Sequence, residues 1–158
     1  MTFFLTVGFL GTTLWLIARY RLAIADAFYR LPVSPRWAAV IAAAVFSIIE
    51  EASINLASGT LPVLLGTVPP LVLFTVVFGT LGRRCRARTI RYPLLALMLF
   101  GVLFEATVGG HRHAFQHPES AGVLIVGVGL AAMTYAYTAM VGLTMLIEHR
   151  TPRTTLSG

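Results

Sequence analysis

The stretch AGVLIVGVGLAAMTYAYTAMVGLTMLI, residues 121–147, contains no charged side chain. A helix of that length is about 40 Å long, which exceeds the roughly 30 Å thickness of a bilayer's hydrocarbon layer. Four shorter apolar segments precede it. The predicted spans cover about residues 3–19, 37–57, 61–81, 92–109 and 121–147. We therefore predict an all-α fold, a polytopic membrane helical bundle of five transmembrane helices that forms a single transmembrane domain over residues 1–158.

The composition of the whole chain supports this class. Of its 158 residues, 57% are hydrophobic and 11% are charged, and the mean hydropathy is +0.82. About a quarter of the residues of a soluble globular domain are charged, so that class is excluded. The single cysteine, Cys85, excludes a disulfide within the chain.

The first apolar segment carries its charges after it, at Arg19 and Arg21, whereas a secretory signal carries them before. We therefore expect this segment to be retained as a helix. Residues 20–30 mix charged and apolar side chains, with Asp26 four residues before Arg30. This spacing is favourable on a helix and predicts a short interfacial extension that ends before Pro32.

Arginine placement predicts the orientation. The net charge of +6 comes from twelve arginines and no lysine. All but Arg112 lie in three segments, at positions 19, 21, 30 and 36, positions 83, 84, 86, 88 and 91, and positions 150 and 153. Five spans place these segments on one side, which the positive-inside rule makes the cytoplasm. We predict a multi-pass protein of the cell membrane with its N-terminus outside and its C-terminus cytoplasmic, and no nucleic-acid partner.

The third span contains Pro69 and Pro70, which lack amide donors. Such residues free carbonyls one turn earlier, here near Leu65 and Gly66, and predict a kink. The alternative is that residues 58–68 re-enter the membrane without crossing it.

Two segments resemble each other. VFSIIEEAS, residues 45–53, aligns without gaps on LFGVLFEAT, residues 99–107, and Glu51 falls on Glu105. Each stretch lies late in a span that begins after an arginine-marked loop. The alignment predicts a two-helix hairpin used twice in parallel orientation.

The repeat indicates a carboxyl pair. Counted from Trp37, Glu51 lies roughly 21 Å along its helix, and Glu105 reaches a similar depth, so the two should meet and share a proton. Asn55 lies one turn further out. Glu50 points about 100° away from Glu51 and has no acidic counterpart, because Phe104 aligns with it, so we do not expect Glu50 to join the pair. Gly101 and Gly109 share the Glu105 stripe, which should face other helices. Further hydrogen-bond partners could come from Thr67, Thr75, Thr134, Tyr135, Tyr137 and Thr138.

An acidic side chain at this depth is costly and is usually functional. The structural alternative is that protonated glutamates only join helices by hydrogen bonds. In the fourth loop, His111, His113 and His117 with Glu119 could hold a metal ion, but a solvated loop is the favoured interpretation, and we predict no metal and no cofactor. In the third loop, Cys85 could be acylated.

The sequence Ile48-Ile49-Glu50-Glu51, with a second glutamate on another helix, resembles the membrane-integral lycopene-cyclase and terpene-cyclase type of protein. The layout of five spans with buried carboxyls also resembles the emopamil-binding sterol-isomerase group. These resemblances imply that a buried acid protonates an olefin or epoxide, and that a carboxylate and aromatic rings stabilise the carbocation.

We therefore expect an integral membrane enzyme that performs cyclisation or isomerisation of an isoprenoid-like lipid. The predicted catalytic residues are Glu51, Glu105, Asn55 and Glu50, and the predicted substrate-binding rings are Phe46, Phe100, Phe104, Tyr135 and Tyr137. The predicted partners are this lipid-like substrate and membrane lipids, and the chain could form a homo- or hetero-oligomer. A small proton- or cation-coupled transporter and a non-catalytic membrane subunit are the alternatives.

Overall fold

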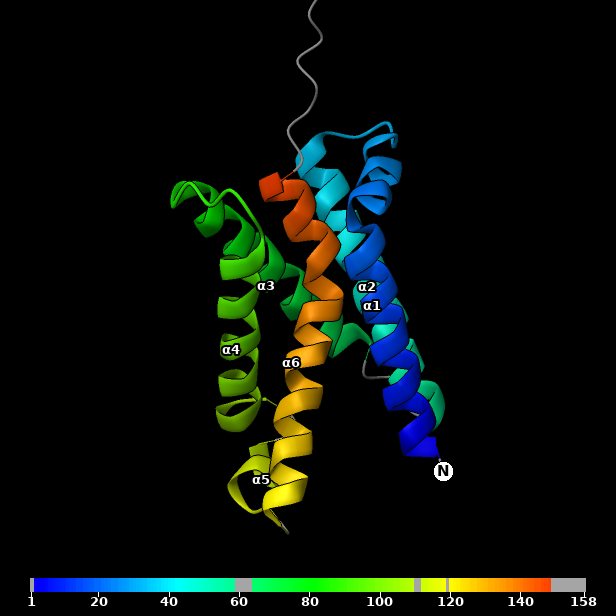
Figure 1. The fold of residues 1–158 in the computed structure, drawn as a ribbon, viewed down its shortest axis with the longest axis vertical. Coiled ribbons are helices and arrows are strands. Elements are labelled where there is room, and N and C mark those ends of the chain that lie inside the picture. Colours follow the sequence, from blue (N-terminus) through cyan, green and yellow to red (C-terminus); the bar gives the residue numbers. More distant parts are fainter. Residues whose placement is uncertain (1, 59–63, 110–111, 119, 149–158) are drawn as a thin grey trace, which may run out of the picture.

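The computed structural model describes residues 2–58, 64–109, 112–118 and 120–148. Its long helices are α1 (Thr2–Tyr29), α2 (Pro35–Ser58), α3 (Leu64–Arg84), α4 (Arg91–Thr107) and α6 (Ala121–Leu143), as Figure 1 shows. A short helix, α5 (Arg112–Gln116), precedes α6, and a π-helical turn, η2 (Thr144–Glu148), follows it. No strand occurs in these residues, so the all-α prediction is confirmed for the described part of the chain.

Two helical segments are long and apolar enough to cross a membrane within the described residues, Gly66–Arg84 and Ala121–Glu148. Helix α4 has 17 residues, slightly fewer than a typical span. Helix α2 contains two acidic residues, Glu50 and Glu51, which are costly inside a membrane. Five membrane-spanning helices therefore remain a prediction. Helix α1 continues without a break to Tyr29, so the segment predicted as an interfacial extension is part of the same helix.

Helix α3 contains both prolines of the third apolar segment. Leu65 and Gly66, where the sequence predicts a kink, already belong to this helix. The re-entrant alternative falls largely on residues 59–63, which lie outside the described residues. From Leu64 onward the chain is one continuous helix.

Helix α6 is the centre of the bundle. Figure 1 shows it between α4 and α1, with α2 and α3 behind it. Every residue from Tyr135 to Met145 is buried, whereas most of the first half of α6 is exposed. Close packing here requires a small side chain at Gly142, since a Cβ there would lie 2.8 Å from Thr75 Cγ2 and 3.3 Å from the Ala39 carbonyl oxygen. Small residues at helix contacts are typical of membrane bundles.

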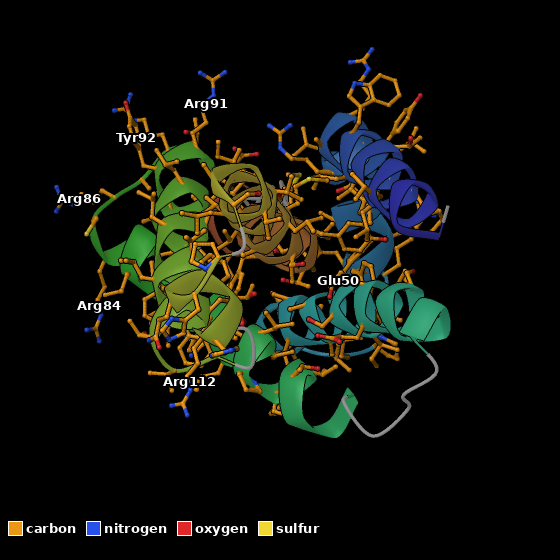
Figure 2. All side chains as sticks on the ribbon, turned by 90° about the horizontal axis from the view of Figure 1, so that it is seen from below. Glu50, Arg84, Arg86, Arg91, Tyr92 and Arg112 are labelled. Atoms are coloured by element: carbon orange, nitrogen blue, oxygen red, sulfur yellow. The ribbon has the colours of Figure 1, made fainter. Side chains whose placement is uncertain are left out.

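The two arginine-rich segments that the structure describes, residues 19–36 and 83–91, lie at one end of the bundle. The α1–α2 and α3–α4 connections and the end of η2 gather there, while the first turns of α1 and α6 lie at the opposite end (Figure 1). Arg84, Arg86 and Arg91 project outward from the rim in Figure 2.

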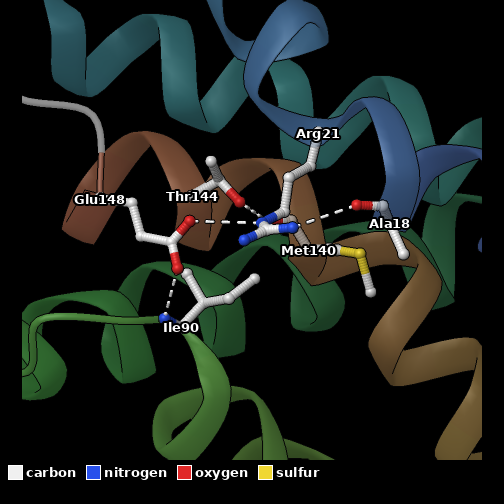
Figure 3. Close-up of polar contacts among 6 residues, drawn as sticks. All are labelled: Ala18, Arg21, Ile90, Met140, Thr144 and Glu148. Carbon is white, nitrogen blue, oxygen red and sulfur yellow. Dashed lines mark hydrogen bonds and ion pairs between the residues drawn. The ribbon is translucent and has the colours of Figure 1, made fainter.

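At the same end, Glu148 joins three segments (Figure 3). Its Oε2 accepts a hydrogen bond from Arg21 Nε of α1 at 3.2 Å, and its Oε1 accepts one from the Ile90 backbone amide at 3.0 Å. Ile90 directly precedes α4. A carboxylate at this place supplies the helix with an acceptor and a favourable charge, because the first amides of a helix lack partners within it. The Tyr29 hydroxyl also donates to the Met145 carbonyl at 2.7 Å.

We expect Glu148→Ala to lower the free energy of unfolding by about 2 kcal/mol, because a charge-assisted hydrogen bond and a partly exposed ion pair are both lost. Glu148→Gln should cost less, since its amide oxygen can still accept from the Ile90 amide. Thermal unfolding of the purified protein in detergent measures both effects. An unchanged melting temperature in Glu148→Ala would show that this contact does not hold α1 and α4 together.

Candidate functional site

Helix α2 turns one face toward the centre of the bundle, and Glu50 lies on it. The residues of this face of α2 recur at helical spacing and are all buried: Ala39, Ala43, Phe46, Ser47 and Glu50. Glu50 is fully buried, at 0% exposure, and Figure 2 shows it in the middle of the bundle. Thr134 Oγ1 of α6 donates a hydrogen bond to Glu50 Oε1 at 2.7 Å. The repeat gives Glu50 no acidic counterpart, yet it is the most deeply buried carboxyl that the structure describes.

Two buried polar atoms of this face have no hydrogen-bond partner among the described residues. They are Glu50 Oε2 and Ser47 Oγ. Buried polar atoms are almost always satisfied by protein or by ordered water. This part of α2 can therefore accept a further polar group.

Glu105 reaches the same centre from α4. The Tyr135 hydroxyl of α6 donates to Glu105 Oε1 at 3.3 Å. A Cβ at Gly109 would collide with the Glu105 carboxyl, and one at Gly101 would collide with the Tyr135 ring. Gly101 and Gly109 are both buried. Gly101 and Glu105 of the predicted stripe thus face α6, which agrees with the expectation that the stripe faces another helix, whereas Gly109 packs against Glu105 itself.

Glu51 completes the group of carboxyls. It is 8% exposed. Glu51 and Glu105 both lie within electrostatic range of Glu50, and all three act on the Tyr135 hydroxyl. Glu50 thus lies with Glu51 and Glu105 around one stretch of α6. The sequence-based expectation that Glu50 stays apart from the other two carboxyls is wrong, because this face of α2, and not only the Glu51 side, packs against α6. Direct contact between Glu51 and Glu105 remains a prediction, and the Asn55 side chain lies outside the described residues.

The predicted aromatic residues separate into two clusters on opposite sides of α6. Around Phe74 of α3, ring centroids lie at 4.9 Å for Phe100, 5.3 Å for Phe104 and 6.3 Å for Tyr135. We call these four residues the Phe74 cluster. It includes Tyr135, which is hydrogen-bonded to Glu105, so rings and a carboxyl adjoin there.

The second cluster contains Phe46, whose ring centroid lies 6.0 Å from that of Tyr137 and 6.3 Å from that of Phe28. The Tyr137 hydroxyl is hydrogen-bonded to Thr13 of α1. These contacts join α1, α2 and α6, and they give Phe46 and Tyr137 a packing role.

Of the other hydroxyl groups singled out in the sequence, Thr75 donates to the Leu71 carbonyl at 2.9 Å, and Thr138 donates to the Tyr135 carbonyl at 3.3 Å. Each of these bonds joins two residues of the same helix. Thr134 and Tyr135, in contrast, reach carboxyls on neighbouring helices. The sequence offers no signal that separates these two pairs. Which hydroxyl reaches a neighbouring helix depends on how α3 and α6 are rotated relative to the helices around them.

The fourth loop contains α5, with His113 within it and His117 just after it. No group of three or more metal-ligating side chains occurs in the described part of the chain. His111 and Glu119, which the sequence adds to the candidate metal set, lie outside that part. A shallow apolar depression lies nearby on the exposed half of α6, away from the carboxyls, and its lining is Ser120, Gly122, Val123, Val126, Gly127 and Leu130.

No protein-family model, curated protein or solved structure matches this chain. The site must therefore be interpreted from its own chemistry. Within the described residues it consists of carboxyls on α2 and α4, hydroxyl donors on α6 and aromatic rings from α3, α4 and α6. Such a set can hold, donate and accept protons in an apolar interior.

Proposed function

We propose that the protein is an integral membrane enzyme that cyclises or isomerises an isoprenoid-like lipid by acid-base chemistry. The observation that carries the proposal is the position of Glu105, which accepts a hydrogen bond from Tyr135 beside the rings of the Phe74 cluster. The resemblance of Ile48-Ile49-Glu50-Glu51 to the membrane-integral lycopene-cyclase and terpene-cyclase type supports the same chemistry.

The proposed reaction begins with proton transfer to a carbon–carbon double bond. Carboxyls that share an apolar site do not all ionise together, so one cluster provides both a proton donor and a carboxylate base. Glu51 and Glu105 fill these two roles. The proton adds to one olefinic carbon and leaves a carbocation, which the faces of aromatic rings stabilise. Loss of a proton from a neighbouring carbon to the carboxylate forms the new double bond and restores the charge of the cluster.

Glu50 acts in this proposal as a positioning residue. Thr134 fixes one of its oxygens, and its second oxygen is buried without a partner among the described residues. Its charge state affects Glu51 and Glu105 through the electrostatic contact with both.

A comparison of lipid extracts from cells with and without the gene tests the proposed function. We expect a cyclised or isomerised product that appears only with the gene. Failure to find any altered lipid, together with proton-coupled flux through the protein in liposomes, would support the transporter alternative instead. If neither an altered lipid nor proton-coupled flux is found, the non-catalytic membrane subunit would replace the enzyme and the transporter as the proposed function.

We also propose the multi-pass orientation with the N-terminus outside and the C-terminus cytoplasmic. The gathering of the two described arginine-rich segments, residues 19–36 and 83–91, at one end supports it. So do Leu95, Leu99 and Leu103, which recur every four residues along α4 and are each more than half exposed. An apolar stripe of this kind is a liability in water and suits contact with membrane lipids.

The orientation predicts that Cys85, which is exposed in the α3–α4 connection, faces the cytoplasm. A membrane-impermeant maleimide should label it in inverted vesicles and leave it unlabelled in intact cells. The matched control joins Cys85→Ser with Arg112→Cys, which moves the thiol to the other end of the bundle and should reverse the pattern. Labelling of Cys85 in intact cells would refute the orientation.

A further inference from the structure

Among its described residues, the segment that joins α4 to α6 contains two exposed histidines with no assigned role, His113 and His117. The His117 backbone amide donates to the His113 carbonyl at 2.9 Å, so the two residues are one helical turn apart. Residues four apart on a helix lie on the same side of it. Figure 1 shows this segment, with α5, beside the first turns of α6 at the end opposite the arginine-rich connections.

The spacing of the two rings fits a shared ligand. Their centroids are 5.0 Å apart, with planes inclined at 51°. When two imidazoles bind one tetrahedral ion with metal–nitrogen distances of about 2 Å, their ring centroids lie roughly 5 Å apart. The observed separation of the two centroids agrees with this value.

In place of the metal-free solvated loop that the sequence predicts, we propose that His113 and His117 form a two-ligand site for a borderline divalent transition-metal ion such as Zn²⁺ or Ni²⁺. Neutral imidazole suits these ions, whereas Mg²⁺ and Ca²⁺ prefer oxygen ligands. Because both rings are exposed, water completes the coordination. The site is independent of the carboxyl cluster and of the reaction proposed for it.

Metal binding at this turn has a structural consequence. Gln116 Nε2 donates to the Ala106 carbonyl at 3.3 Å, and this bond connects the α5 segment to the last turn of α4, next to Glu105. An ion held by His113 and His117 would add a second link within the turn that contains Gln116. Binding should therefore raise the melting temperature of the protein.

The test is calorimetric titration of Zn²⁺ and Ni²⁺ into the full chain, purified in detergent without a polyhistidine tag. We expect one ion per chain, and His113→Ala and His117→Ala should each weaken binding at least about tenfold, because each removes one of two protein ligands. The matched control combines His113→Ala with Arg112→His. It preserves the number of histidines but moves one imidazole about 100° around the helix, so its binding should be as weak as that of His113→Ala.

The melting temperature without metal verifies that each variant is folded. Absence of binding by the unaltered chain at millimolar metal would overturn the proposal. So would equal affinity in the unaltered chain and the two alanine variants, or strong binding by the shifted-histidine control.

Discussion

Glu105→Gln should lower the rate of product formation at least about 100-fold, the lower limit of what a positioned general acid or base contributes. Glutamine retains the size of the side chain and an oxygen that can accept from Tyr135, but it cannot donate a proton to carbon or remove one. The fold should therefore survive. The rate is measured from the product in lipid extracts, and the melting temperature from the purified protein.

The same loss is expected for Glu51→Gln, because the proposed reaction needs both a donor and a base. Glu148→Gln is the matched control, since it makes the same chemical change in a carboxyl that contacts Arg21 and Ile90 at the end of the bundle. Its rate should remain unchanged. If Glu51→Gln and Glu105→Gln melt normally and retain full activity, proton transfer at these residues is excluded and the glutamates only join helices.

Gly101→Leu should destabilise the protein by about 3 kcal/mol, the upper part of the range for an overpacked core. The Tyr135 ring lies directly against Gly101, and Tyr135 is itself buried at 2% exposure. A leucine at this position would push α4 from α6 or force the ring out of its place. The hydrogen bond from Tyr135 to Glu105 would then be lost as well.

Thermal unfolding in detergent measures this effect, and Gly129→Ala provides the control. A Cβ at Gly129 would meet nothing within 4 Å, so this substitution should leave the melting temperature unchanged or raise it slightly through better helix propensity. A normal melting temperature in Gly101→Leu would show that α4 and α6 do not pack through Tyr135 as described.

The helices and the Glu105 stripe could be predicted because they follow from local periodicity. Apolar runs separated by arginine-containing or loop-forming segments define α1 to α4 and α6, and the four-residue spacing of Gly101 and Glu105 indicates which side of α4 meets another helix. The hydroxyl groups of Thr134 and Tyr135 were also among the predicted partners, although the sequence does not show which carboxyl each one reaches.

The remaining features depend on how helices are placed against one another. Phe74 is absent from the predicted rings because the approach of α3 to α4 is a tertiary contact, with Phe74 and Phe100 centroids 4.9 Å apart. Glu148 was not singled out, since its partners Arg21 and Ile90 are distant in sequence. The depth of Glu50 likewise comes from its contact with α6, whereas the sequence repeat aligns only Glu51 with Glu105.

In the proposed reaction, a carboxyl of this cluster donates a proton to a carbon atom of an isoprenoid-like lipid. The most direct measurement is the mass of the product formed by the membrane-embedded protein in heavy water, because carboxyl protons exchange with solvent before transfer. The proposed proton transfer predicts a product that carries deuterium on carbon and that Glu105→Gln fails to form. A product without carbon-bound deuterium, or one that Glu105→Gln forms at the normal rate, would contradict it.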